Sequence, residues 1–173
     1  MNDLLLLAML FGGPTHGYAL KKRAGWLTGQ ADLHNNLVYP LLGKFLKAGW
    51  IQQKASKGQR GQTRDIYSLT AKGKAELLRR LGEFSEKDAA SENAFRMRVG
   101  MFFALDAGAR ARILRARDAY LEQREQRFVN LASTMELGIW GDEVTSFLRQ
   151  QVRAERKWIS RLKKKAISQS SWD

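Results

Sequence analysis

The sequence contains no cysteine, and only two histidines and two prolines occur among its 173 residues. Without cysteine the chain can form neither a disulfide bond nor a thiolate zinc site, and two histidines do not assemble into a metal site. No run of 18 or more apolar residues occurs, so we expect no membrane-spanning segment. We interpret the apolar stretch 4–11 as a core helix, because it lacks the basic leader and cleavage site of a signal peptide. The sequence therefore favours a cytoplasmic protein without a metal or cofactor.

Sequence signatures of catalysis are also missing. We find no nucleophile elbow, phosphate-binding loop, metal-spaced cluster or pair of carboxylates in a suitable context. An enzyme is therefore not expected, and we assign no catalytic residue.

Acidic residues are few relative to basic ones: 17 against 30, which gives a net charge of +13 and a pI near 10.3. Residues 1–82 contain 13 basic and 4 acidic side chains, a net charge of +9, whereas residues 83–173 have a net charge of only +4. Neutralisation of phosphates dominates sequence-independent affinity for nucleic acid, so the first half is the better candidate for this contact. Charge alone would equally suit a merely soluble basic surface.

Three helices are predicted at the start of the chain, over residues 4–11, 15–27 and 33–48, from the spacing of their apolar residues. Thr15 and Asp32 are the expected N-caps of the second and third helices, since a side-chain oxygen can accept a bond from a free N–H of the first turn.

A β-hairpin is predicted next. Residues 50–54 and 64–69 have strand patterns and enclose a polar, glycine-bearing tip at 55–63. Thr70 is the expected N-cap of a fourth helix over residues 71–81. The order helix, helix, helix, strand, wing, strand, helix is that of a winged helix-turn-helix with a two-stranded wing.

The second half contains only helical patterns. Residues 83–94 are polar and are interpreted as a linker, and long helices are expected over about 109–137 and 142–166. We therefore predict a mainly α protein with a winged helix-turn-helix domain at 1–82 and a helical domain at 95–173.

Four segments of the first half together resemble the PadR family of transcriptional regulators. Residues 13–20 read Gly-Pro-Thr-His-Gly-Tyr-Ala-Leu, similar to the family's Gly-Pro-x-His-Gly-Tyr-x-Leu signature. Residues 37–42 resemble its Leu-Tyr-Pro-x-Leu recognition-helix segment, residues 46–51 the exit from that helix, and residues 67–73 the start of the fourth helix. The resemblance covers roughly residues 4–80 and implies a DNA-binding regulator. The second half is more loosely similar to virulence-activator-type members, which have a C-terminal helical dimerisation region.

Two departures from the family pattern concern the DNA-reading parts. Residues 60–64 lack the proline that the family often has before the second wing strand, and residues 32–36 replace the usual Ser/Thr at the start of the recognition helix. We expect these departures to alter the bases that are read, not the fold.

The recognition helix offers polar side chains at the end that would enter the major groove, namely His34, Asn35 and Asn36. An asparagine amide can bond both N6 and N7 of adenine, and helix capping or a solvated surface is the alternative. For Tyr39 and Lys44 on the same helix we also expect DNA contact. The resemblance implies a phosphate contact through the Tyr39 hydroxyl, and a core tyrosine packed against the wing is the alternative.

The second helix contributes Tyr18, Lys21 and Lys22, which could straddle the DNA backbone as the first helix of such a pair does. A solvated basic face is the alternative.

The wing tip is interpreted as a minor-groove contact, since a narrow groove attracts basic side chains. A solvated, disordered loop is the alternative. The basic residues assigned to it are Lys54, Lys57, Arg60 and Arg64.

The long helices of the second half have apolar stripes that need a partner, most simply a second copy of the chain. A two-fold dimer would bind a palindromic operator with half-sites about 34–36 Å apart or a multiple of that. The residues assigned to dimerisation are Tyr120, Leu121, Phe128, Leu131, Phe147, Leu148, Trp158, Ile159 and Leu162.

Some members of the resembled family bind aromatic effectors between domains, which suggests a pocket of Phe95, Phe102 and Trp158. Ordinary core packing of these aromatic residues is the alternative. The sequence thus predicts a repressor that binds double-stranded DNA as a homodimer and is released by a small aromatic effector. The competing interpretation is a helical interaction protein that binds nucleic acid only non-specifically.

Overall fold

The computed structural model describes residues 2–20, 22, 35–57 and 63–168. The chain divides into two compact units. The N-terminal unit comprises residues 1–83 and 96–104, and the helical unit comprises residues 84–95 and 105–173.

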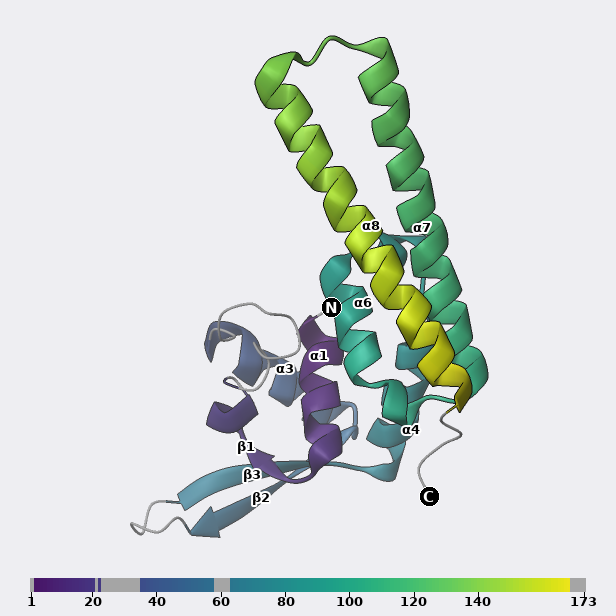
Figure 1. The fold of residues 1–173 in the computed structure, drawn as a ribbon. Helices are drawn as coiled ribbons and strands as arrows, with labels where there is room; N and C mark the ends of the chain where they lie inside the picture. Colours follow the sequence, from purple (N-terminus) through teal and green to yellow (C-terminus); the bar gives the residue numbers. More distant parts are fainter. Residues whose placement is uncertain (1, 21, 23–34, 58–62, 169–173) are drawn as a thin grey trace. The chain divides into compact units, whose positions relative to one another are not determined.

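The N-terminal unit has the winged helix-turn-helix order (Figure 1). Its described strands pair antiparallel in the order β1-β3-β2, so the predicted two-stranded wing is extended by a third strand. The predicted fold class is confirmed. In chain order the elements are α1 Asn2–Met9, the 3-10 helix η1 Leu10–Gly12, β1 Thr15–His16, helical residues 17–20, α3 Asn35–Lys47, β2 Ile51–Lys57, β3 Thr63–Leu69, α4 Ala71–Gly82, and the 3-10 helix η2 Phe102–Ala104.

The core of the N-terminal unit forms around α1, whose four consecutive leucines at 4–7 are all buried. Four neighbours in a row can be buried only if other elements cover the helix on several sides, and α1 contacts both α3 and α4. An ion pair at the rim joins the Asp3 carboxylate to the Arg80 guanidinium at 2.7 Å. Burial raises the pKa of Asp3, but the hydrogen bond and charge of Arg80 outweigh it and lower that pKa to about 2.

Strand β1 corrects the prediction that Thr15 caps the second helix. Thr15 pairs with Tyr67 and His16 pairs with Ile66 along the edge of β3, and the helical residues begin only at Gly17. Thr15 is also buried. The main-chain bonds offered by β3 keep these two residues extended, a long-range partner that local sequence does not reveal.

The wing strands are longer than predicted. Their register runs from Ile51 opposite Leu69 to Lys57 opposite Thr63, so residues 55–57 and 63 of the predicted tip are strand. Residues 52–55 of β2 are all exposed, which removes the apolar alternation by which a strand is recognised in sequence.

The start of α4 is bonded to the chain that leaves α3. Thr70 caps α4 as predicted, since its hydroxyl accepts a hydrogen bond from the Gly73 N–H at 3.0 Å. The same hydroxyl donates to the Gly49 carbonyl at 2.7 Å, and the Thr70 N–H donates to the Trp50 carbonyl at 3.0 Å. Lys72 Nζ donates to the Ala48 carbonyl at 2.9 Å. These bonds tie the base of the wing to both α3 and α4.

Gly73 lies directly against this junction. A Cβ at this position would stand 1.8 Å from the Trp50 carbonyl oxygen and 2.6 Å from its carbon. Backbone atoms cannot move away as a flexible side chain can, so only glycine allows α4 to approach this closely.

We predict that Gly73→Ala destabilises the full-length protein by about 3 kcal/mol, because the added methyl group forces α4 away from Trp50. Urea denaturation followed by tryptophan fluorescence measures this change. Gly82→Ala is the matched control, since a Cβ at 82 meets nothing within 4 Å, and it should cause no loss of stability. Equal stability of the two variants would contradict the proposed close packing.

The helical unit contains α5 Glu86–Ala90, the first residues of α6 Glu92–Gly100, α7 Ala107–Thr134 and α8 Gly138–Ser168. The stretch 83–94, interpreted from the sequence as a linker, thus folds largely into helix. Ser85 and Asp88 form a reciprocal capping box at the start of α5, and Ala89 is buried. This short helix was not predicted because its sequence is polar and only one small apolar side chain, Ala89, is buried.

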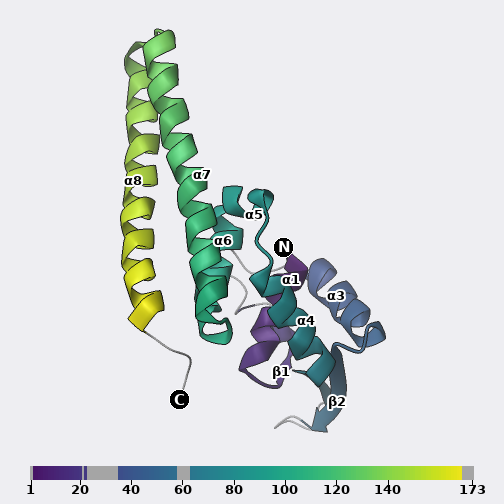
Figure 2. The same ribbon diagram turned by 90° about the vertical axis from the view of Figure 1, so that its right-hand side faces the viewer.

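Helices α7 and α8 run side by side as an antiparallel hairpin (Figure 2). Arg117 of α7 is completely buried, and its guanidinium donates two hydrogen bonds of 2.8 Å to the Glu155 carboxylate of α8. It also donates to the Ala89 carbonyl of α5 at 2.6 Å. A second tie joins Asp118 to Arg156 at 3.0 Å and to Lys163 at 2.6 Å.

The helices that the structure describes include none that combines the length and apolar character needed to cross a membrane.

Candidate nucleic-acid interface

The exposed face of α3 carries the polar residues predicted to contact DNA. Asn36, Tyr39 and Lys44 are exposed, whereas Val38 and Leu42 on the other face are buried in the core. The helical period thus separates packing residues from those that can meet a partner. Tyr39 retains 53% of its accessible surface, so it is not the core tyrosine that the alternative interpretation required.

Several predicted contacts cannot be placed. His34, Lys21 and Arg60 lie outside the described residues. Asn35 is the first residue of α3 and Lys57 the last of β2, but their side chains also lie outside the part of the chain that the structure describes.

The wing brings two predicted basic residues together on one face. Lys54 lies opposite Ile66 and Arg64 opposite Ser56, so the side chains of Lys54 and Arg64 leave the hairpin on the same side. Both are exposed. Both lie within the strands and not at the tip, since β2 runs to Lys57 and β3 begins at Thr63.

Tyr18, which follows the first residue of the second helix, is 62% exposed. The Lys22 ammonium lies over its ring, 5.2 Å from the centroid. A cation at this distance interacts favourably with the ring. These two predicted contacts therefore form one exposed basic and aromatic pair.

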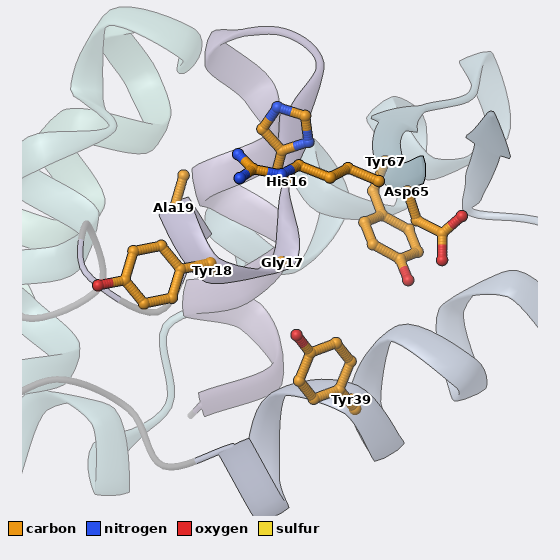
Figure 3. Close-up of a pocket in the computed structure, with 8 residues that line it drawn as sticks. His16, Gly17, Tyr18, Ala19, Tyr39, Asp65 and Tyr67 are labelled. Carbon is orange, nitrogen blue, oxygen red and sulfur yellow. The ribbon is translucent and has the colours of Figure 1, made fainter. Parts of the chain in front are cut away.

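A pocket of about 460 Å³ joins the second helix, α3 and β3 (Figure 3). It is lined by His16, Gly17, Tyr18, Ala19, Tyr39, Arg64, Asp65 and Tyr67. Three of the predicted DNA-contact residues, Tyr18, Tyr39 and Arg64, therefore come from three separate elements to one site. This convergence is typical of a binding surface.

Five pocket residues were not predicted from the sequence as site residues: His16, Gly17, Ala19, Asp65 and Tyr67. Tyr67 is 7% exposed and was classed with the second wing strand, and Gly17 had been noted only as part of the signature segment. Burial raises the pKa of Tyr67, and the nearby Asp65 and Tyr39 raise it further, so this phenol remains protonated near neutral pH. The aromatic residue of an alternating strand was the available signal, since the apolar side chains of such a strand point to its buried face.

The residues assigned to dimerisation fall into two groups. Leu121 and Ile159 are completely buried within the helical unit, so their apolar surface is already covered in a single chain. Tyr120 lies against the Arg117 guanidinium, 5.4 Å from its ring centroid. Phe147 is 58% exposed and Leu131 is also exposed. Phe128, Leu148, Trp158 and Leu162 are half-buried.

Further exposed apolar residues lie at the connection between the end of α7 and the start of α8. They were not assigned to dimerisation from the sequence. Trp140 is 84% exposed, and Met135, Ile139 and Val144 are exposed as well. Gly138 and Gly141 near Trp140 were interpreted from the sequence only as a helix break. The apolar residues between and beside them were therefore not recognised as an exposed surface.

The aromatic residues assigned to an effector pocket belong to both units. Phe95 is completely buried and contacts Trp158 edge-to-face, with ring centroids 5.7 Å apart. Phe102 belongs to the N-terminal unit. Within the helical unit, Phe95 and Trp158 are therefore packed against each other, and a shared pocket with Phe102 stays a prediction.

Comparison with known proteins gives a family match over the N-terminal unit. The family model described as "Transcriptional regulator PadR-like family" matches residues 6–79, from α1 to α4. Among solved structures, a candidate transcriptional regulator of Thermoplasma acidophilum is 33% identical over 43% of this chain and 71% of its own, with a TM-score of 0.40. No match was found among curated proteins.

Two structures of Bacillus subtilis PadR are similar over more of the chain. The structure in complex with operator DNA is 16% identical over 95% of this chain and 98% of its own, with a TM-score of 0.48. The structure in complex with p-coumaric acid is 15% identical over 95% of this chain and 97% of its own, with a TM-score of 0.42.

We predict that Arg64→Ala weakens binding to duplexes of any sequence alike and reduces the slope of log affinity against log salt by about one, because one phosphate contact is lost. Fluorescence anisotropy at several salt concentrations measures the slope. Arg79→Ala is the control, since Glu76 and Glu83 already pair with this exposed arginine. A wild-type slope in the Arg64 variant would remove Arg64 from the interface.

Proposed function

Because the chain belongs to the PadR-like family of transcriptional regulators, we propose that it binds a specific operator in double-stranded DNA as a homodimer and acts as a repressor. The observation that carries this proposal is the exposed polar face of α3, with Asn36 in its first described turn and Tyr39 and Lys44 beyond it. A helix that enters the major groove needs polar groups at its N-terminal end and a buried opposite face.

The division of roles follows from side-chain chemistry. Asn36 has an amide that can donate to N7 and accept from N6 of adenine, so it is the base-reading residue among those described. Lys44, Lys54 and Arg64 carry only donors and a positive charge, which suits phosphates. Base contacts then set the sequence that is bound, and phosphate contacts set the position of the protein on it.

The dimer is proposed from the exposed end of the α7–α8 hairpin. Trp140 and Phe147 expose large apolar surfaces close to each other in sequence, with Ile139 and Val144 between and beside them. Contiguous apolar surface of this kind typically marks an association site. A second copy offers the same surface by two-fold symmetry and would place two reading helices on a palindromic operator.

For regulation we propose release by a small aromatic effector. Trp158 is half-buried and covers the completely buried Phe95, so a flat ligand that displaces Trp158 could stack on Phe95 in its place. Such a ligand would perturb the helical unit, where the dimer contacts are proposed.

The DNA-binding proposal predicts that the protein prefers its selected operator over random duplex by about 10³-fold or more at physiological salt. Sequences selected from a random duplex library supply the operator, and competition binding measures the ratio. Asn36→Ala should remove a base contact and so reduce the free energy of discrimination between operator and random duplex by about 1–3 kcal/mol. Wild-type affinities that agree within a few-fold would instead favour the alternative, a helical interaction protein with non-specific nucleic-acid binding.

The dimer proposal predicts that Phe147→Glu produces monomers at concentrations where the wild type is dimeric, because a charge would be buried in an apolar interface. Sedimentation velocity measures the change in mass. Ser160→Glu is the control, since it adds the same charge at an exposed site further along α8. A wild type that is monomeric throughout, or a dimeric Phe147 variant, would contradict this interface.

A further inference from the structure

The charge of α8 changes sign from one end of the helix to the other. Residues 138–148, which follow the connection from α7, contain the acidic residues Asp142 and Glu143 and no basic residue. Residues 149–168 contain eight basic residues and one acidic residue. Because α8 runs along the whole length of the hairpin (Figure 2), the two charges lie at opposite ends of one long element.

Contacts with α7 account for only part of the positive charge. Three basic side chains of α8 form ion pairs of 2.6 to 3.0 Å with acidic residues of α7, namely Arg153, Arg156 and Lys163. Lys157 and Arg161 are exposed and form no ion pair with any of the described residues, and the same is true of Glu143 at the other end. These three charges are therefore available to a partner.

The available charges lie on one exposed face of α8. Residues 143, 147, 150, 154, 157 and 161 are separated alternately by four and three residues, which places them on one side of an α-helix, and all six are exposed. This is the spacing at which long helices pair along a seam. Ser160, although exposed, lies outside this face. We call the six residues the α8 seam: Glu143, Phe147, Gln150, Ala154, Lys157 and Arg161.

Stabilisation of the single helix does not explain where these charges lie. The helix dipole favours acidic residues in the first turn and basic residues in the last, but the first turn of α8 has no acidic residue, and the basic residue in its last described turn is Lys165. Lys157 and Arg161 are four residues apart and carry the same charge, an arrangement that destabilises a helix. An acidic partner would offset this repulsion.

We propose that the α8 seam pairs antiparallel with the α8 seam of a second copy, about a two-fold axis beside Gln150. Residue 150 is midway between residues 143 and 157, so the two-fold rotation places Glu143 of each chain opposite Lys157 of the partner subunit, with Arg161 of the partner subunit one turn further on. Phe147 then lies opposite the small side chain of the partner's Ala154. The proposal rests on the proposed homodimer, because it states how the second copy is bound.

Charge selects the second copy and its direction. A parallel pair would place Lys157 opposite the partner's Lys157 and Glu143 opposite the partner's Glu143, and both contacts are repulsive. Nucleic acid would suit the basic end of the seam, but Glu143 would repel phosphates and Phe147 would remain exposed. An antiparallel second copy complements the acidic, apolar and basic parts of the seam together.

Cross-linking tests the direction of pairing, and the absence of native cysteine makes single-cysteine variants unambiguous. Gln150→Cys should form covalent dimers with a short bismaleimide, because the two copies of residue 150 face each other. Glu143→Cys and Lys157→Cys should not do so alone, since the two copies of each residue lie about 21 Å apart along the helices. An equimolar mixture of these two variants should cross-link. Cross-linking of all three variants alone would show a parallel pair and overturn the proposal.

Charge reversal tests the pairing without cysteine. Glu143→Lys and Lys157→Glu should each raise the Kd of the dimer by about 10-fold or more at low salt, because each places like charges opposite each other. The double variant exchanges the two charges and should return the Kd to within about three-fold of the wild type. Arg115→Glu, at an exposed site of α7, is the matched control and should not change the Kd. A double variant as weak as the two single changes combined would contradict the pairing.

The outcomes separate this proposal from the function on which it rests. A dimeric wild type with no cross-link at residue 150 and no response to charge reversal would overturn the seam alone. A monomeric wild type that still discriminates its operator would overturn the dimer and the seam, but not specific DNA binding. Dimerisation unchanged by Lys157→Glu, together with weaker binding to random duplex, would show that the basic end contacts nucleic acid and would also overturn the proposal.

Discussion

The N-terminal unit depends on the close approach of α4 to the backbone at Trp50. Gly73 permits that approach, and Thr70 uses its hydroxyl and N–H to bond the chain that leaves α3. The chain reaches Trp50 directly from α3 and returns to Thr70 directly from β3, so the two ends of the wing close on each other here. Any displacement at this junction would change the angle between α3 and the wing. The surface proposed to meet DNA is therefore positioned by packing at the Trp50 junction, by residues that are not themselves among the proposed DNA contacts.

Strand β1 completes this arrangement from the other direction. Thr15 and His16 bond to the edge of β3, and Gly17 follows them directly at the start of the second helix. Strand β3 therefore positions both reading elements. The second helix is attached to it through β1, and α3 is attached through the junction at Trp50. A pocket whose lining comes from these three elements has its side chains placed before a ligand arrives, which reduces the conformational entropy lost on binding.

The sequence predicted what local physics decides. The Thr70 cap, the order of helices and strands and the exposed polar residues of α3 follow from periodicity, capping chemistry and the family resemblance, and the structure has them. The differences arise where a distant partner decides. Thr15 is extended because it pairs with β3, and residues 55–57 are strand because they pair with residues 63–65. Helix α5 is stabilised by its contact with α7, with Ala89 buried. Tyr67 was recognisable as a strand residue, but its position opposite Tyr39 depends on how α3 packs on the sheet, which no local pattern encodes.

In the helical unit a buried charge has the corresponding organising role. Removing the Arg117 guanidinium from water costs several kcal/mol, and the structure offsets this cost with the bidentate Glu155 carboxylate and the Ala89 carbonyl, which join α5, α7 and α8 at one level. Leu121 lies one helical turn beyond Arg117, and Ile159 one turn beyond Glu155, and both are completely buried there. Phe147 and Trp140 lie toward the other end of the hairpin, where the apolar surface remains exposed. The apolar residues near Arg117 are therefore covered within one chain. Those at the other end of the hairpin are left for the second copy that the proposed operator complex requires.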